Sequence, residues 1–150
     1  MRRQEGTMKN GNDFGRSISL LNRAAGAYFS KSLKPLGLGP GQQAYLLALE
    51  PGECINQDAL AERLQVDKAN VTRALAALEA LACVRRLPSA RDGRERLIEL
   101  TARGLSVRDE AEAVASSWAR RLQAGFSDDE WDELEALLSR ASGNASPRPY

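Results

Sequence analysis

The chain of 150 residues contains no histidine, only two cysteines and no apolar run long enough to span a bilayer. Without histidine, the usual catalytic triads, histidine bases and histidine metal sites are absent, so we expect neither an enzyme nor a bound cofactor or metal. Two cysteines make a poor disulfide framework, which favours the reducing cytoplasm. The first twelve residues are polar and lack the apolar core of a secretory signal. These absences favour a cytoplasmic binding protein.

The formal net charge of +1 conceals segments of opposite sign. Residues 1–34 contain seven basic and two acidic residues, and residues 63–96 contain eight basic and four acidic ones. Residues 109–135, in contrast, contain nine acidic and two basic residues. A nearly neutral protein of this kind can still present a positive face to phosphate groups. Ordinary charge scatter on solvated helices is the alternative.

The middle of the chain has the pattern of two helices joined by a tight turn. Asn56 is a good N-cap for a helix over residues 57–64, which has leucines on its buried side. Residues 65–67 then form the turn, and we expect Asp67 to cap a longer helix over residues 68–82. This is the helix-turn-helix arrangement, which places its second helix in the major groove of DNA. The motif predicts a regulator of transcription.

The outward face of this second helix carries small side chains. Placed at about 100° per residue, four of its five most outward positions are alanine and the central one is Arg73. Such a face can approach the floor of the major groove, where Arg73 can pair with guanine and Asn70 with adenine. The residues predicted to face DNA are Lys68, Ala69, Asn70, Thr72 and Arg73. The alternative is an alanine-rich helix chosen for propensity alone, or packed on both sides.

We expect an arginine-rich hairpin, or wing, to follow. Residues 84–87 and 95–100 are short strand-like runs, and Asp92, which is followed by glycine, marks a hairpin turn between them. Exposed arginines on a narrow loop suit the negative potential of the minor groove, so Arg91 and Arg94 are candidate DNA contacts. We expect Asp92 to brace an arginine through a charge-assisted hydrogen bond. An ordinary solvated hairpin is the alternative.

Apolar stripes at helical spacing mark long helices at both ends of the chain. One stripe lies in residues 14–28 and predicts a helix that ends near Leu36. A second stripe lies in residues 107–122, and Ser127 with Glu130 forms a capping box for a final helix. Long terminal helices suit a dimerisation layer, although they could also close the core of a monomer.

Together these segments resemble the multiple-antibiotic-resistance regulator (MarR) family of winged-helix repressors. The resemblance spans roughly residues 14–141 and depends on the order and spacing of short motifs, which are Asn56–Leu64, Val66–Arg73, Leu78–Glu79, Val84–Arg86, Asp92–Arg94 and Leu100–Gly104. Because the family's members are homodimers, the resemblance implies a dimer through the terminal helices. It also implies a set of DNA-contacting residues, with Lys68, Asn70, Thr72 and Arg73 on the recognition helix and Arg94 in the wing.

The resemblance also implies that a small molecule controls DNA binding. Many similar regulators bind small aromatic or phenolic ligands between the dimer layer and the DNA-binding lobe, and Tyr28, Tyr45 and Trp118 are the candidate lining residues here. Amphipathic aromatic residues are, however, more often core residues. Relatives that sense peroxides have a cysteine near the start of the first helix, where this chain has none. We therefore expect Cys54 and Cys83 to be buried, unreactive thiols, with redox sensing as an alternative.

The sequence thus predicts a mainly helical winged helix-turn-helix protein with a β-wing between the fourth and fifth of its six helices. The expected parts are a flexible N-terminus (1–12), dimerisation helices (about 13–36 and 101–142), a DNA-binding lobe (about 40–100) opened by a helix from Pro40, and a disordered tail (143–150). The expected function is ligand-responsive repression from a pseudo-palindromic operator bound by a homodimer. A helical interaction module that has lost DNA binding is the alternative.

Overall fold

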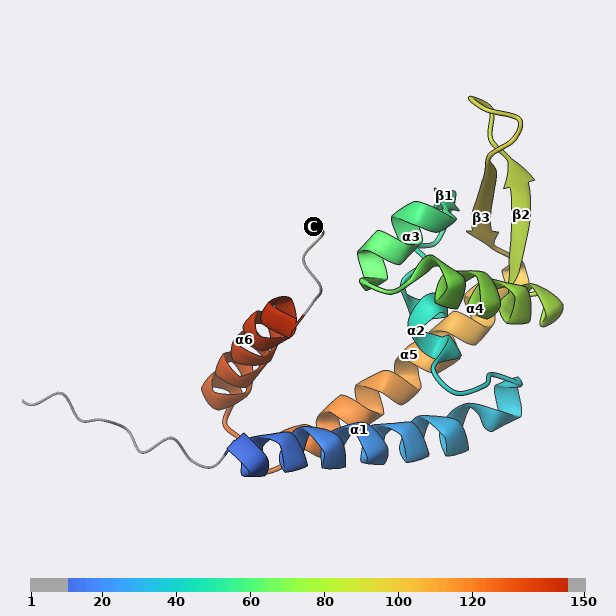
Figure 1. Ribbon diagram of the computed structural model, residues 1–150. Helices are drawn as coiled ribbons and strands as arrows, with labels where there is room; N and C mark the ends of the chain where they lie inside the picture. Colours follow the sequence, from blue (N-terminus) through green and yellow to red (C-terminus); the bar gives the residue numbers. More distant parts are fainter. Residues whose placement is uncertain (1–10, 146–150) are drawn as a thin grey trace, which may run out of the picture.

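The computed structural model describes residues 11–145, so the predictions for residues 1–10 and 146–150 lie outside the described part. Long helices form one layer and a compact lobe lies above it (Figure 1). The helices are α1 (Gly11–Leu33), η1 (Lys34–Leu36), α2 (Gln42–Leu47), α3 (Gln57–Leu64), α4 (Lys68–Ala80), α5 (Ala102–Gln123) and α6 (Asp128–Ala145), and the strands are β1 (Ile55–Asn56), β2 (Val84–Pro88) and β3 (Arg96–Leu100). The predicted order of helices and wing is confirmed.

The helix-turn-helix forms where the sequence predicts it. Asn56 is the N-cap of α3, and its side-chain oxygen accepts a hydrogen bond from the backbone N–H of Ala59 at 2.8 Å. Gln65 ends α3 in a left-handed conformation with φ +53°, and the next backbone N–H, of Val66, donates to the carbonyl oxygen of Ala61 at 3.1 Å. The predicted cap of α4 is wrong in detail, because Asp67 precedes that helix without a side-chain capping bond.

Helix boundaries differ from the predictions where the backbone adopts a left-handed conformation. Gly41 has φ +75°, so α2 begins at Gln42 and not at Pro40. Ala82 has φ +56°, which is incompatible with a continuing helix, and α4 ends at Ala80. Ala82 is exposed in the following turn, so the prediction that it belongs to the buried face of α4 is wrong. The buried face of α4 is completed by Ala74, which the prediction missed.

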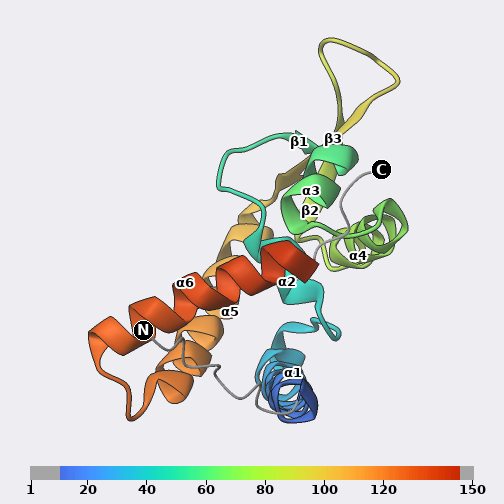
Figure 2. The same cartoon turned by 60° about the vertical axis from the view of Figure 1, so that its left-hand side comes forward.

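A three-stranded antiparallel sheet closes the lobe in the order β1-β3-β2. In this sheet Ile98 of β3 lies between Ile55 of β1 and Arg86 of β2. The two wing strands confirm the predicted hairpin with ends shifted by one residue, whereas β1 was not predicted. The hairpin projects from the end of the lobe farthest from α1 (Figures 1 and 2).

The start of α5 is anchored to the lobe. Thr101 caps α5 by accepting from the backbone N–H of Gly104 at 2.9 Å, and its hydroxyl donates to the carbonyl oxygen of Ala82 at 2.6 Å. A Cβ at Gly104 would lie 1.8 Å from the carbonyl oxygen of Cys83, so only glycine allows this approach. From this anchor α5 runs down to α1 (Figure 1).

The terminal helices pack less completely. Phe14 is 65% exposed and Ile18 is 42% exposed on α1, and α6 has no buried residue. The capping box before α6 is confirmed, since Ser127 N–H donates to Glu130 Oε2 at 2.8 Å and Glu130 N–H donates to Ser127 Oγ at 3.3 Å. Helix α1 begins two residues before its predicted start and ends at Leu33, three residues before its predicted end, because residues 34–36 form the 3-10 helix η1. Helix α6 extends to Ala145, so residues 143–145 are helical and do not belong to the predicted disordered tail. No described helix combines the length and the apolar character that crossing a membrane requires.

Candidate DNA-binding surface

The outward face of α4 has the small side chains that the sequence predicts. Ala69, Arg73, Ala76 and Ala80 are exposed, and Ala77 is half-buried. The opposite face of α4 is buried in the lobe. Because the outward residues are exposed, the alternative that α4 is packed on both sides is wrong for the centre of this outward face. A shallow outer surface with one long cation is therefore presented to solvent.

Arg73 and Asn70 lie together on this face. Nη2 of Arg73 donates a hydrogen bond to Oδ1 of Asn70, one turn earlier in α4. This contact holds the guanidinium group close to the amide, so both groups face the same patch. A guanidinium and an amide side by side match the acceptor and donor edges of neighbouring base pairs.

Thr72 and Lys68 are already engaged within the lobe. The Thr72 hydroxyl donates to the carbonyl oxygen of Lys68 at 2.9 Å and accepts from Nε2 of Gln57 at 2.6 Å. Nζ of Lys68 lies 2.6 Å from Oδ1 of Asp58, in an ion pair exposed to solvent. Exposed pairs of this kind are weak, so Lys68 can turn toward a phosphate, whereas Thr72 primarily fixes α4 against α3.

The wing loop presents two arginines. Arg91 and Arg94 are exposed, and within the described residues neither guanidinium has a hydrogen-bond or ion-pair partner. Oδ1 of Asp92 accepts from the backbone N–H of Arg94 at 3.0 Å, and Oγ of Ser89 accepts from the backbone N–H of Arg91 at 3.2 Å. Asp92 therefore braces the loop backbone and not an arginine side chain, which corrects the predicted role.

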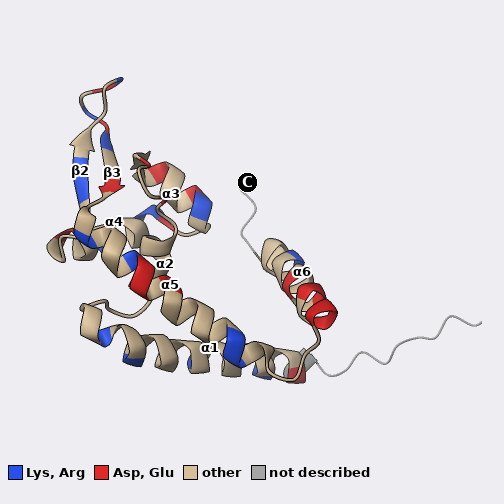
Figure 3. Ribbon diagram, turned by 180° about the vertical axis from the view of Figure 1, so that it is seen from behind, with Lys and Arg blue, Asp and Glu red and all other residues tan. Residues whose placement is uncertain are grey.

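Further basic residues connect the wing to the helix-turn-helix. Arg86 of β2 donates to Gln57 of α3 at 3.3 Å and to Glu79 of α4 at 3.0 Å. Arg86, Arg94, Arg96 and Lys68 also line a hollow of about 300 Å³ beside the start of α3. The sequence prediction assigned no role to Gln57, Arg86 or Arg96, although the paired arginines at 85 and 86 were part of the motif it used. Figure 3 shows basic residues along β2 and in the wing loop.

Known proteins share both this sequence pattern and this fold. A sequence profile described as the MarR family matches residues 36–95. The chain is 28% identical to the transcriptional regulator YybA of Bacillus subtilis, over 89% of each chain. A MarR transcriptional regulator from Methanosarcina mazei is 31% identical in its solved structure, with a TM-score of 0.78, over 89% of this chain and 96% of that one.

The chain belongs to the MarR family of transcriptional regulators. A mutant of Escherichia coli MarR, solved in complex with operator DNA, is 27% identical over 91% of this chain and 99% of that one, with a TM-score of 0.76. The members of this family are DNA-binding transcription factors and not enzymes. In this MarR-family regulator the profile match runs from η1 into the wing loop, and it includes α4 with the Arg73–Asn70 pair.

The three aromatic residues predicted to line a ligand pocket do not lie together. The rings of Tyr28 and Trp118 are 5.1 Å apart between their centroids, and both line a pocket of about 930 Å³ between α1 and α5 that is open to solvent. Tyr45 lines a different hollow, of about 300 Å³, beside Asn70 and Arg73 of α4. The prediction of one pocket with all three aromatic residues is therefore wrong.

The two cysteines differ in burial. Cys83 is buried, as predicted, and desolvation raises its pKa. Cys54 is exposed, which contradicts the prediction, and its Sγ donates to Oε2 of Glu99 at 3.3 Å. This hydrogen bond, with desolvation and the Glu99 charge, raises the pKa of Cys54, so its thiolate is disfavoured. Neither environment is that of a low-pKa, reactive thiol.

Proposed function

We propose that this MarR-family regulator is a homodimeric repressor that binds an inverted-repeat operator and responds to a small aromatic effector. The observation that supports operator binding best is the outward face of α4, with its alanines around the Arg73–Asn70 pair. The exposed wing arginines on the same lobe suit the adjacent minor groove. Such a protein acts in the cytoplasm on DNA.

The dimer is supported by the terminal helices. Exposed apolar residues recur on both of them, and the set is Phe14, Ile18, Leu20 and Leu21 of α1 with Leu137 and Leu138 of α6. Arg16, Arg23 and Lys31 make α1 basic, whereas the first turn of α6 is acidic. Burial of these faces against a second copy removes apolar surface from water and pairs opposite charges. Two-fold symmetry then gives each operator half-site one recognition helix.

The effector is supported by the open pocket between α1 and α5. Its lining combines Tyr28 and Trp118 with apolar residues, and Lys31 and Arg121 add positive charge. Leu20 and Leu21 belong both to this lining and to the proposed dimer face, so the second copy would border the pocket. Aromatic faces with a few charged groups recognise a flat, amphipathic ligand, and cations select an anionic one. We therefore expect an aromatic or phenolic compound, with a carboxylate as the favoured anionic group.

Selection from random-sequence DNA tests the proposal directly. Wild-type protein should enrich an inverted repeat whose half-site centres lie about 10 base pairs apart. Binding of the enriched DNA should weaken steeply as salt rises, because phosphate contacts release counterions. A population that shows no enrichment after repeated rounds, together with salt-independent binding, would instead support a helical interaction module that does not read DNA.

A further inference from the structure

The end of α2 is held from the side of α5 by one arginine. Arg108 donates from Nε to the carbonyl oxygen of Leu49 at 2.9 Å and from Nη2 to that of Leu47 at 3.5 Å. Nη1 pairs with Oε2 of Glu112 at 3.0 Å, and Nη2 lies 3.7 Å from Oε2 of Glu50. The Arg108 side chain is only 14% exposed, so its two backbone contacts are partly buried, whereas the carboxylates of Glu112 and Glu50 are 59% and 64% exposed.

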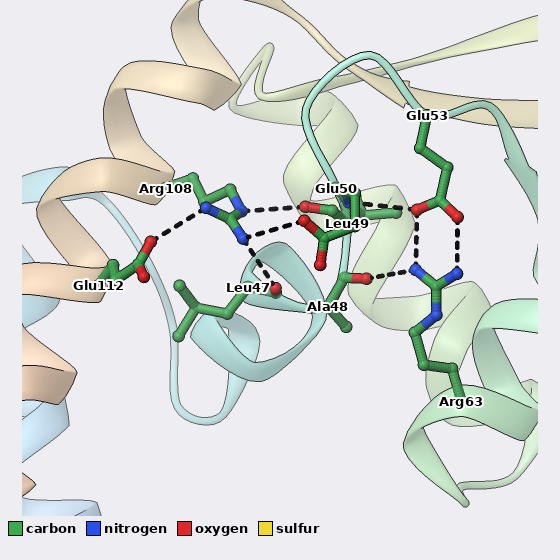
Figure 4. A network of polar contacts seen from close by, with 8 residues as sticks. All are labelled: Leu47, Ala48, Leu49, Glu50, Glu53, Arg63, Arg108 and Glu112. Carbon is green, nitrogen blue, oxygen red and sulfur yellow. Dashed lines mark hydrogen bonds and ion pairs between the residues drawn. The ribbon is translucent and has the colours of Figure 1, made fainter.

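A second arginine, from α3, holds the same segment (Figure 4). Arg63 donates from Nη1 to the carbonyl oxygen of Ala48 at 2.7 Å. Its guanidinium also makes a two-pronged contact with the Glu53 carboxylate, at 2.6 and 2.8 Å. This hydrogen-bonded pairing lowers the pKa of Glu53. Figure 4 shows the two guanidinium groups on opposite sides of the segment.

Residues 47–53 therefore form a junction between the dimer layer and the helix-turn-helix. Three successive carbonyl groups at the end of α2, which lack partners within that helix, accept hydrogen bonds from Arg108 and Arg63. Cations at a helix C-terminus are also favoured by the helix dipole. Planar guanidinium groups with several fixed donors constrain direction as well as distance.

Arg108 supplies a second point of attachment for α5. The first is the start of the helix, where Thr101 and Gly104 contact the backbone of residues 82 and 83. Arg108 lies four residues beyond Gly104, which is about 6 Å along a helix. Val107 and Ala111 of α5 also pack into the core of the lobe, so the helix is already seated by apolar contacts. Apolar contacts are not directional, whereas the hydrogen bonds of Arg108 fix the angle at which α5 meets the end of α2.

We propose that Arg108 and Arg63 are positioning residues that set the angle between α5 and the helix-turn-helix, and with it the half-site spacing that the dimer accepts. This inference rests on the proposed function, because spacing has meaning only for two recognition helices joined through the dimer layer. In the proposed dimer each lobe is attached to the dimer layer through its own α5. A change in the angle between α5 and the lobe therefore moves α4 relative to the two-fold axis. Neither arginine lies on the outward face of α4 or in the wing, so neither reads bases itself.

Operators with altered centres test the inference. The selected operator is compared with versions one base pair shorter and one base pair longer at the centre, each step changing the separation by about 3.4 Å and rotating one half-site about the axis. Wild-type protein should prefer the selected spacing by about tenfold or more, a difference of about 1.4 kcal/mol. In Arg108→Gln and Arg63→Gln this preference should fall to about twofold, with binding to an isolated half-site unchanged.

Arg120→Gln is the matched control. Arg120 lies on α5 and is exposed, and its guanidinium donates to Ser117 at 3.0 Å. This variant loses the same charge from the same helix and should keep the wild-type spacing preference. Arg108→Lys keeps the charge but cannot reach Leu49, Leu47 and Glu112 with separate fixed donors, so it should fall between wild type and Arg108→Gln. Circular dichroism verifies that each variant is folded, and if Arg108→Gln is not, Arg108→Lys and Arg63→Gln decide.

The inference is overturned if folded Arg108 and Arg63 variants keep the wild-type spacing preference. It is overturned equally if they lose the same factor of affinity at every spacing, since that is the behaviour of a general affinity or stability defect. A wild-type protein that binds the selected DNA without any spacing preference contradicts the proposed dimeric binding itself, and the positioning role falls with it.

Discussion

Apolar side chains are buried to different degrees in two regions of the molecule. One region is the lobe between α2 and β3, and the other consists of the terminal helices α1 and α6. In the lobe Leu46, Leu60, Leu75, Leu78 and Ile98 are completely buried. On α1 and α6 comparable side chains are exposed, and α6 buries none. The lobe therefore has its core within one chain, whereas the terminal helices have apolar faces that only another surface can cover. Stability and DNA reading should depend on the first region and assembly on the second.

The largest effect is expected from a cavity in the lobe. Leu75→Ala removes a fully buried side chain from α4 and should lower the free energy of unfolding by about 2–5 kcal/mol. Leu20→Ala on α1 removes the same atoms from a side chain that is 59% exposed within one chain, so its loss should be smaller and, because Leu20 belongs to the proposed dimer interface, should depend on protein concentration. Chemical denaturation of both variants at several protein concentrations measures the difference. Equal losses in the two would mean that the lobe and α1 do not differ as described.

The next effect concerns assembly. A double substitution of Ile18 and Leu21 with glutamate places charges on the exposed apolar face of α1. The dissociation constant of the dimer should rise by about 100-fold or more, because each copy loses buried apolar area. The backbone amide NMR shifts of the lobe should not change, and analytical ultracentrifugation measures the association. A variant that stays as dimeric as wild type would show that this face lies outside the interface.

A smaller effect, confined to the lobe, is expected for base reading. Arg73→Ala should weaken operator binding by about 1–3 kcal/mol while binding to unrelated DNA changes much less. Arg120→Ala serves as the control, since Arg120 is exposed on α5, outside the candidate DNA-binding surface. Fluorescence anisotropy with both DNAs measures the two affinities. An equal loss on the operator and on unrelated DNA would make Arg73 a phosphate contact.

The wing should give the smallest of these effects. Arg94→Ala should weaken binding by about 1 kcal/mol and reduce the preference for an A·T-rich flank with a narrow minor groove. Asp92→Ala should act more mildly, since Asp92 holds only the backbone N–H of Arg94. Affinities for operators with A·T-rich and G·C-rich flanks measure this preference. If both variants match wild type on both flanks, the hairpin does not contact DNA.

The sequence predicted what local signals specify. Asn56 caps α3, the turn after Leu64 falls where it was expected, and the Ser127–Glu130 capping box precedes α6. Each of these features depends on side chains within about four residues of one another. The outward face of α4 followed from helical periodicity alone, for the same reason.

Features that depend on distant residues were missed. The strand β1 has only two residues and exists because β3 pairs with it. Gln57 fixes Thr72, fifteen residues away, and the exposed Cys54 donates a hydrogen bond to Glu99, 45 residues away. Tyr28 and Tyr45 looked equivalent in the sequence, yet they line separate hollows because α1 and α2 pack against different neighbours. Such pairings have no signature in a local pattern.

The most direct measurement is the number of chains bound to one operator. Sedimentation of the full chain at micromolar concentration, alone and with the selected DNA, tests both regions at once. In our proposal the lobe binds the operator and the terminal helices join two copies of the chain. We expect a dimer without DNA, and two chains on each inverted repeat with half-site centres about 10 base pairs apart. A monomer that protects a single half-site with full affinity would contradict the account.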